Sequence, residues 1–175
     1  MEVQSRASVQ SLGVRDVSYF RLPDNRFDTL PLLEIVKLIE NLIATRKPTV
    51  VYTHHAGDLN IDHVLTNRAV LTATRPEPGM CVREVLSFEV PSSTEWAFGI
   101  QPTFEPNVFV DISETLSAKL KAMGMYEGES RIYPHPRSSE ALTSIAAHRG
   151  SMVGVNYAEA FVLLRAFFAE ENPPS

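Results

Sequence analysis

The 175-residue sequence contains one cysteine, Cys81, no long apolar run and no cluster of lysine or arginine. A lone cysteine excludes an internal disulfide and a cysteine-based zinc site. A membrane helix needs roughly 18 consecutive apolar residues, and the polar N-terminus lacks the pattern of a secretion signal. The formal net charge of -5 argues against nucleic-acid and anionic-membrane partners. We therefore expect a cytoplasmic protein with small-molecule or protein partners.

Length and patterning predict a single α/β domain over residues 1–175. With 44% hydrophobic and 21% charged residues, the chain can bury one ordinary core. The order strand, helix, strand is typical of a mostly parallel sheet with crossover helices. Apolar periodicity and turn residues give the expected elements. The helices are expected at 1–12, 32–43, 62–74, 113–123 and 138–149, and the strands at 16–20, 49–53, 82–90, 107–112 and 160–164.

The segment 52–63 is the densest in metal-capable side chains. It reads Tyr-Thr-His-His-Ala-Gly-Asp-Leu-Asn-Ile-Asp-His and holds three of the five histidines and two carboxylates. It connects an expected strand to an expected helix, and open α/β sheets bind ligands at the carboxyl ends of their strands. A catalytic zinc ion takes about three ligands from His, Asp or Glu and keeps one position for water. This segment is therefore the candidate site.

Within the segment, His63 is the expected metal ligand. The positive end of a helix dipole disfavours protonation of an imidazole, and a metal requires the neutral form. Asp62 is a helix N-cap, a carboxylate that orients a neighbouring group, or both. His54 and His55 are either surface residues or ligands, and adjacent side chains on an extended backbone point in opposite directions. A self-contained metal site of His54, His55, Asp58 and His63 is a further hypothesis.

The string from Thr53 to His63 resembles the second signature of the PIG-L/LmbE family of zinc-dependent N-acetylsugar deacetylases. That signature has a Thr-His after a strand, followed by Asp-x-Asn/His-x-Asp-His. The resemblance implies a Rossmann-like three-layer α/β/α fold and hydrolysis of the acetamido group of an N-acetylated sugar or glycoconjugate. Further family-like landmarks occur in order at Leu12-Gly13-Val14, Leu22-Pro23-Asp24, Arg75-Pro76, Phe88-Glu89, Ser92–Trp96, Pro106-Asn107, Arg149-Gly150 and Ala158–Phe161.

The resemblance also implies roles for individual residues. His63 matches the family's downstream zinc ligand, and Asp62 matches its companion carboxylate. Asn60 stands where many members have a histidine that steadies the oxyanion, and an amide N–H can donate in the same way. Arg75 is either a phosphate contact or an exposed helix-end residue, and Trp96 would line the rim of a sugar site. The resemblance thus implies Asp62 and Asn60 as catalytic residues. The substrate-binding residues implied in this way are His54, Asp58, Arg75 and Trp96.

The family's first signature, Ala-His-Pro-Asp-Asp-Glu, does not occur in the 175 residues. In the family it supplies a zinc histidine, a zinc aspartate and the general base. We therefore expect an incomplete zinc site, no activity of this chain alone, and a sheet without the family's N-terminal strands. An unpaired strand edge would invite a second chain. Three explanations stay open: a fragment, half of a split enzyme, and a non-catalytic descendant that binds a sugar or a protein.

Overall fold

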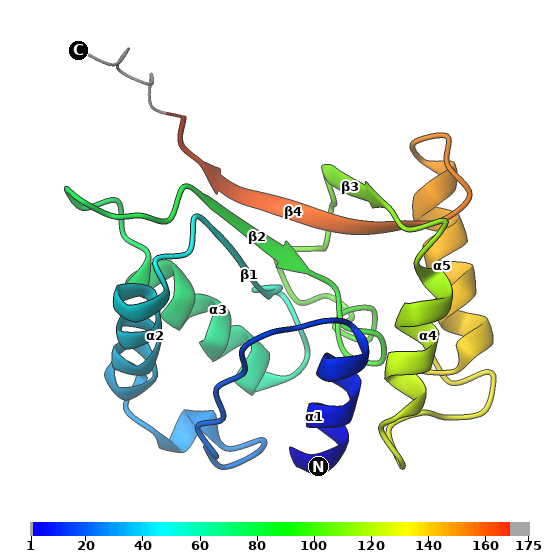
Figure 1. Ribbon diagram of the computed structural model, residues 1–175, viewed down its shortest axis with the longest axis horizontal. Helices are drawn as coiled ribbons and strands as arrows, with labels where there is room; N and C mark the ends of the chain where they lie inside the picture. The colour runs from blue at the N-terminus through cyan, green and yellow to red at the C-terminus, as the bar shows by residue number, and fades with distance from the viewer. Residues whose placement is uncertain (1, 169–175) are drawn as a thin grey trace. The chain divides into compact units, whose positions relative to one another are not determined.

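The computed structural model describes residues 2–168 (Figure 1). The chain divides into two compact units. Unit 1 consists of Met1–Leu22 and Val108–Ala160, and unit 2 consists of Pro23–Asn107 and Phe161–Ser175. Among the described residues, no helix combines the length and the apolarity needed to cross a membrane. The candidate loop lies within unit 2.

Unit 2 contains a parallel strand pair and two helices that pack against each other. Strands β1 and β2 pair in register from Val50↔Glu84 to His54↔Phe88. Their carboxyl ends therefore adjoin, and the loops that follow them begin side by side. In chain order the elements are η1 (Phe27–Thr29), α2 (Leu32–Arg46), β1 (Val50–His54), α3 (Ile61–Ala73) and β2 (Glu84–Phe88).

Helix α2 confirms the helix predicted at 32–43 and extends it to Arg46. Its apolar residues recur at helical spacing, which buries one face against α3. Pro31 occupies the N-cap position without a side-chain cap. Lys47 ends the helix in the left-handed conformation, with φ 49°. The buried apolar residues of unit 2 are Ile35, Val36, Ile43, Ala69, Val70, Ala73, Val82, Val85 and Leu86.

The sheet has four strands in the order β1-β2-β4-β3, with β4 at Ala158–Ala166 and β3 at Val108–Asp111. Only β1 and β2 are parallel, because β4 runs antiparallel to β2 with Phe88 opposite Phe161. The prediction of a mostly parallel sheet is therefore wrong: apolar patterning identified the strands but carries no information on their direction. Within residues 2–168, β1 pairs with β2 alone. The expected helical layers on both faces stay a prediction.

Unit 1 contains α1 (Glu2–Ser11), β3, α4 (Leu116–Gly124) and α5 (Ser139–Ser151). Its apolar cluster consists of Ile112, Leu116 and Ala146, with Leu120 and Tyr157 packed against it. Helix α1 is joined to α4 by a hydrogen bond of 3.0 Å from the buried Ser8 hydroxyl to the Ala122 carbonyl.

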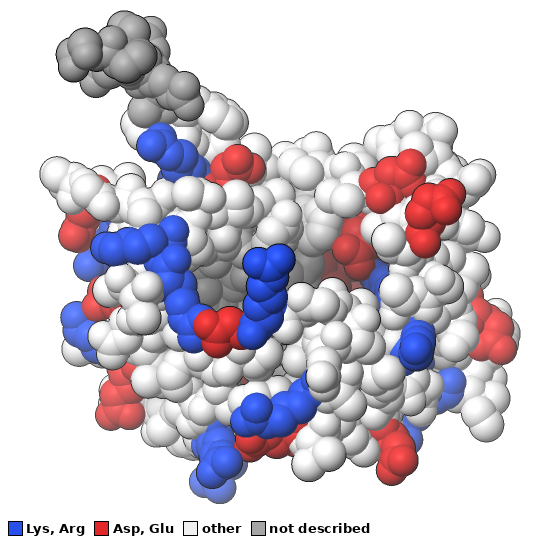
Figure 2. Space-filling view, in the orientation of Figure 1, with Lys and Arg blue, Asp and Glu red and all other residues white. Residues whose placement is uncertain are grey.

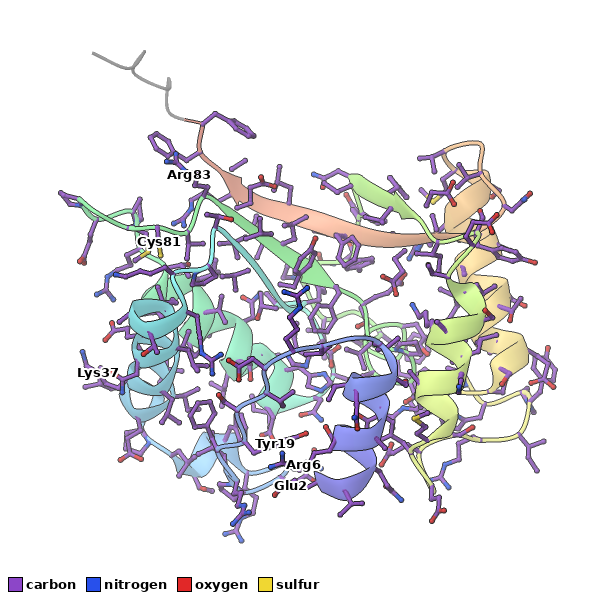
Figure 3. All side chains as sticks on the ribbon, viewed as in Figure 1. Glu2, Arg6, Tyr19, Lys37, Cys81 and Arg83 are labelled. Carbon is purple, nitrogen blue, oxygen red and sulfur yellow. The ribbon has the colours of Figure 1, made fainter. Side chains whose placement is uncertain are left out.

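The strand predicted at 16–20 does not form, because this segment makes no backbone ladder. Side chains hold it instead. The Tyr19 hydroxyl donates to Ser5 Oγ at 3.1 Å, and the Arg6 guanidinium lies 4.8 Å from the centre of the Tyr19 ring (Figure 3). Arg6 also pairs with Glu2 at 2.9 Å. An alternating pattern therefore produced an extended segment packed on α1 and not a strand.

Two buried serines provide a matched stability test. Ser87 Oγ on β2 is buried and has no hydrogen-bond partner among the described residues, whereas Ser138 Oγ accepts from Ala141 N at 3.1 Å and caps α5. An unsatisfied buried hydroxyl costs stability, and loss of an N-cap costs about 1 kcal/mol. We expect Ser87→Ala to raise the free energy of unfolding by about 1 kcal/mol and Ser138→Ala to lower it by about 1 kcal/mol. Urea unfolding of both variants checks this, and equal destabilisation by both would contradict it.

Candidate functional site

The candidate site begins where β1 ends at His54 and α3 starts at Ile61. Asn60 is the N-cap of α3, since its Oδ1 accepts from the Asp62 backbone N–H at 2.9 Å. Of the two roles considered for Asp62, that of the helix N-cap is therefore excluded, since the cap lies two residues earlier. A cap formed by an asparagine carbonyl satisfies one of the free N–H groups of the first turn.

The Asp62 carboxylate holds a neighbouring segment in place. Its two oxygens accept from the backbone N–H groups of Asn25, at 2.6 Å, and Phe27, at 2.9 Å. The Asn60 side chain adds to this contact through a bond of 3.2 Å from Nδ2 to Asn25 Oδ1. Asp62 and Asn60 together fix residues 25–27 against the N-terminus of α3.

Asp58 lies at the centre of the loop, and its side chain is fully covered. Oδ1 accepts from the Asn60 backbone N–H at 2.9 Å and lies 3.0 Å from His63 Nδ1. The hydroxyl of Ser93 also bonds to Oδ1, and that of Thr94 bonds to Oδ2 at 2.8 Å. The carboxylate therefore joins its own loop, α3 and the loop that follows β2.

These contacts favour the ionised form of Asp58. Burial alone would raise the pKa of this carboxyl group, because it removes water from the charge. The hydrogen bonds from His63, Ser93, the Asn60 backbone and Thr94 outweigh burial and hold the pKa of Asp58 well below its ordinary value. Asp58 is therefore an anion that only accepts hydrogen bonds.

The imidazole rings of His54 and His63 stack on each other, with centroids 4.1 Å apart and planes 19° apart. Phe88 on β2 lies against His54 at 4.9 Å between centroids. Burial, with a smaller contribution from His63, lowers the pKa of His54 to about 4. The site therefore presents a neutral imidazole, that of His54, against the face of the His63 ring.

His55 points away from this pair. Its Nε2 donates to the Pro102 carbonyl at 2.8 Å, and its ring packs edge-on against Phe104 at 5.2 Å. Gly57 is required beside this contact, because a Cβ there would overlap the Pro102 carbonyl. The expected divergence of His54 and His55 is thus observed, and the hypothesis of one metal site built from His54, His55, Asp58 and His63 is not supported.

The two other predicted substrate residues lie apart from each other. Trp96 is 40% exposed and follows Ser93 and Thr94 in the loop after β2. Arg75 lies just beyond the C-terminal end of α3, and the helix rises about 15 Å between His63 and its last residue, Ala73. It contacts Glu77 at 3.3 Å and Glu40 at 3.9 Å.

Arg75 lines a pocket of about 450 Å³ in unit 2. Lys37 and Cys81, both labelled in Figure 3, line the same pocket, and Lys37 pairs with Glu40 at 2.6 Å. The pocket therefore mixes charges of both signs, and Figure 2 shows acidic and basic side chains interspersed over the face in view. Its position at the far end of α3 separates it from the histidine pair.

The side chains around His63 meet the requirements of a zinc site only in part. His63 has the form of a zinc ligand, because a carboxylate on one ring nitrogen orients the other toward a metal. Asp58 is fully occupied, and within residues 2–168 no group of three His, Cys, Asp or Glu side chains is placed to hold a metal ion. The described residues therefore fit one ligand and its supporting carboxylate, and they do not form a complete zinc site.

Sequence reasoning did not identify Ser93 and Thr94 as partners of the candidate loop. They lie 35 and 36 positions after Asp58 and form no recognisable motif with it. The topology of the sheet could have indicated this contact. Strands β1 and β2 are parallel neighbours, so the loops that follow them lie at the same edge of the sheet. A hydroxyl-rich loop at that edge is a natural partner for a buried carboxylate.

The family comparison matches the part of the chain that contains this loop. A family model described as PIG-L, GlcNAc-PI de-N-acetylase, matches residues 2–74. The resemblance to the PIG-L family is confirmed. PIG-L proteins are metal-dependent N-deacetylases that act on N-acetylated sugars. The matched residues include Asp58, Asn60, Asp62 and His63.

Solved structures show that the chain has a PIG-L-like fold. The conserved protein TT1542 from Thermus thermophilus has a TM-score of 0.73 and 21% identity, with 99% of this chain and 77% of that chain covered. The N,N'-diacetylchitobiose deacetylase from Pyrococcus horikoshii has a TM-score of 0.72 and 19% identity. That match covers 94% of this chain but 62% of the deacetylase, which is less than two thirds of its length.

A third structure with the same fold carries a different chemistry. GalB, the 4-carboxy-2-hydroxymuconate hydratase from Pseudomonas putida KT2440, has a TM-score of 0.63 and 20% identity, with 98% of this chain and 74% of that chain covered. Identities at this level establish the fold alone. The function of this chain must therefore be argued from its residues.

The hydrogen bonds of Asp58 predict a stability that depends on pH. Because its pKa is lowered in the folded state, Asp58 stabilises the fold above its unfolded pKa of about 4, and this contribution is lost as pH falls toward the folded value. We expect Asp58→Asn to lower the free energy of unfolding by about 2–4 kcal/mol at neutral pH, since the amide cannot accept all four bonds. The deficit should shrink progressively below pH of about 4.

Urea unfolding at a series of pH values measures this deficit. The matched control is Asp28→Asn, which alters an exposed aspartate and should change stability by less than about 0.5 kcal/mol at any pH. A deficit for Asp58→Asn that stays constant down to strongly acidic pH would show that the charge of Asp58 does not stabilise the fold.

Proposed function

We propose that this chain contributes one histidine ligand, His63, to the zinc site of an N-acetylsugar deacetylase. The hydrolase would remove the acetyl group from an N-acetylated amino sugar. One observation carries the proposal: His63, in the first turn of α3, has Nδ1 beside the buried, ionised Asp58. A carboxylate on one ring nitrogen is the usual support of a zinc-bound histidine. The match of residues 2–74 to the PIG-L family supports the same assignment.

The other predicted residues are assigned around His63. Asn60 is proposed to donate from Nδ2 to the developing oxyanion, since one hydrogen of that amide remains after the bond to Asn25. Asp62 is proposed to hold residues 25–27 beside the site. Trp96, which is 40% exposed, is proposed to contact the sugar ring. Arg75 would contact a phosphate only on an extended substrate, because it lies at the far end of α3.

We further propose that the 175 residues by themselves do not catalyse deacetylation. They contain no His-Pro-Asp-Asp string, and among the described residues His63 belongs to no group of three metal-capable side chains. Without a complete ligand set zinc binds weakly, and without a general base the attacking water keeps its proton. Activity would then require ligands from a second polypeptide segment.

We also propose a cytoplasmic location for this chain.

A non-catalytic binding role is the alternative. It is favoured by β1, which has one strand partner within residues 2–168 and exposes Val50 by 38% and Tyr52 by 51%. An exposed strand edge with apolar side chains is suited to pairing with another chain. In that case the loop around His63 would keep its shape but would have no role in metal binding.

Zinc titration of three proteins separates the two roles. We expect the wild-type chain to bind zinc weakly through His63, so that His63→Ala lowers the affinity by on the order of tenfold or more. His148→Ala alters an exposed histidine of α5 and should leave the affinity unchanged. Release of acetate from N-acetylglucosamine derivatives should not be detectable with the chain alone.

Two outcomes would contradict the proposal. Zinc binding that is unaffected by His63→Ala would remove the deacetylase assignment and leave the non-catalytic role. Tight binding of one zinc per chain, together with acetate release that depends on His63, would show that the ligand set is complete and that the proposed inactivity is wrong.

A further inference from the structure

Asp58 has little room to act as a substrate contact. The residue is 2% exposed, and its oxygens already accept from the Asn60 backbone, Ser93 and Thr94. A ligand hydroxyl could reach the carboxylate only by displacing one of these donors. A buried charge that loses a partner is strongly destabilised. The role of Asp58 is therefore to be sought in the protein group it contacts, His63.

The contact with His63 fixes the position of one proton. An ionised carboxylate can only accept a hydrogen bond, so His63 Nδ1, at 3.0 Å from Asp58 Oδ1, must carry the hydrogen. In the neutral ring Nε2 then has a free lone pair. Free imidazole side chains exchange between the two tautomers, and the hydrogen bond of one nitrogen decides the state of the other.

The stacked His54 ring restricts the remaining motion of His63. The two planes lie 19° apart, and His54 is itself backed by Phe88. The backbone of His54 is held by a bond of 2.8 Å from Asn67 Nδ2 to its carbonyl. Tilting the His63 ring would require the His54 ring to move as well. Asp58 therefore sets the direction of the ring nitrogens, and His54 sets the plane of the ring.

We propose that Asp58 is a positioning residue that holds His63 in the Nδ1–H tautomer with Nε2 directed outward, and that Ser93 and Thr94 act through Asp58. This replaces the substrate contact expected for Asp58 from the sequence. Its meaning for catalysis rests on the proposed function, but the tautomer itself is a property of the folded chain. The loop after β2 thereby contributes, through Asp58, to the state of the His63 ring.

His55 supplies an internal control with the opposite tautomer. Its Nε2 lies 2.8 Å from the Pro102 carbonyl, which can only accept, so the hydrogen must be on Nε2. The hydrogen bonds that hold Asp58 involve neither His55 nor Pro102. The same protein is therefore expected to hold His55 and His63 in opposite tautomers.

Nitrogen-15 NMR of the metal-free chain at mildly alkaline pH tests the proposal. In the wild type we expect a pyrrole-type Nδ1 for His63 and a pyrrole-type Nε2 for His55. In Asp58→Asn the ratio of Nδ1–H to Nε2–H forms of His63 should fall by on the order of tenfold, because a charge-assisted bond is lost. The His55 pattern should not change, which also shows that the loop is still folded.

Each result decides the question. A wild-type His63 with its hydrogen on Nε2, or with an even mixture, overturns the proposal without recourse to any variant. An unchanged His63 ratio in Asp58→Asn, with His55 intact, overturns it as well. If the variant unfolds and the His55 pattern is lost, the wild-type spectrum remains the deciding measurement. A correct tautomer together with failed zinc binding would reject the proposed function and leave Asp58 as a positioning residue.

Discussion

The candidate site depends on the burial of one negative charge, the Asp58 carboxylate. A buried carboxylate is tolerated only where donors replace the water it has lost. Here the donors come from the loop itself, from α3 and from the loop after β2, so the charge can be accommodated only when all three segments are in place. The turn of residues 55–60, the orientation of His63 and the position of Ser93 and Thr94 are therefore one cooperative arrangement.

Local signals in the sequence predicted the elements around this arrangement, but not the contacts within it. Helix α2, strand β1 and the position of the loop before α3 follow from the apolar patterning of the segments on either side of that loop. The N-cap of α3 could not be predicted in this way, because Asn60 and Asp62 are both good capping residues. Asn60 is the cap because the Asp62 carboxylate accepts hydrogen bonds from the backbone N–H groups of Asn25 and Phe27. The direction of β4 and the hydroxyl partners of Asp58 depend on pairings across more than 30 positions, which periodicity does not encode.

The fold of this chain does not determine which reaction its site would catalyse. A deacetylase from Pyrococcus horikoshii and a hydratase from Pseudomonas putida both resemble this chain at 19–20% identity. The scaffold is therefore compatible with more than one reaction. The proposed metal-assisted hydrolysis therefore rests on the side chains at the carboxyl end of β1, where a histidine lies beside a buried carboxylate.

Strand β4 is shared between the two units and lies near the C-terminal end of the chain, so it is synthesised late. Its first residues, Ala158–Ala160, belong to unit 1, and the remainder, from Phe161, belongs to unit 2. Helix α2 and the β1–β2 pair can form early during synthesis, but neither unit completes its share of the sheet until β4 has emerged from the ribosome. Contacts that join distant parts of a chain form slowly and leave strand edges open in the meantime. Nascent chains that stop before residue 158 should therefore be the species most prone to associate with one another or to recruit chaperones.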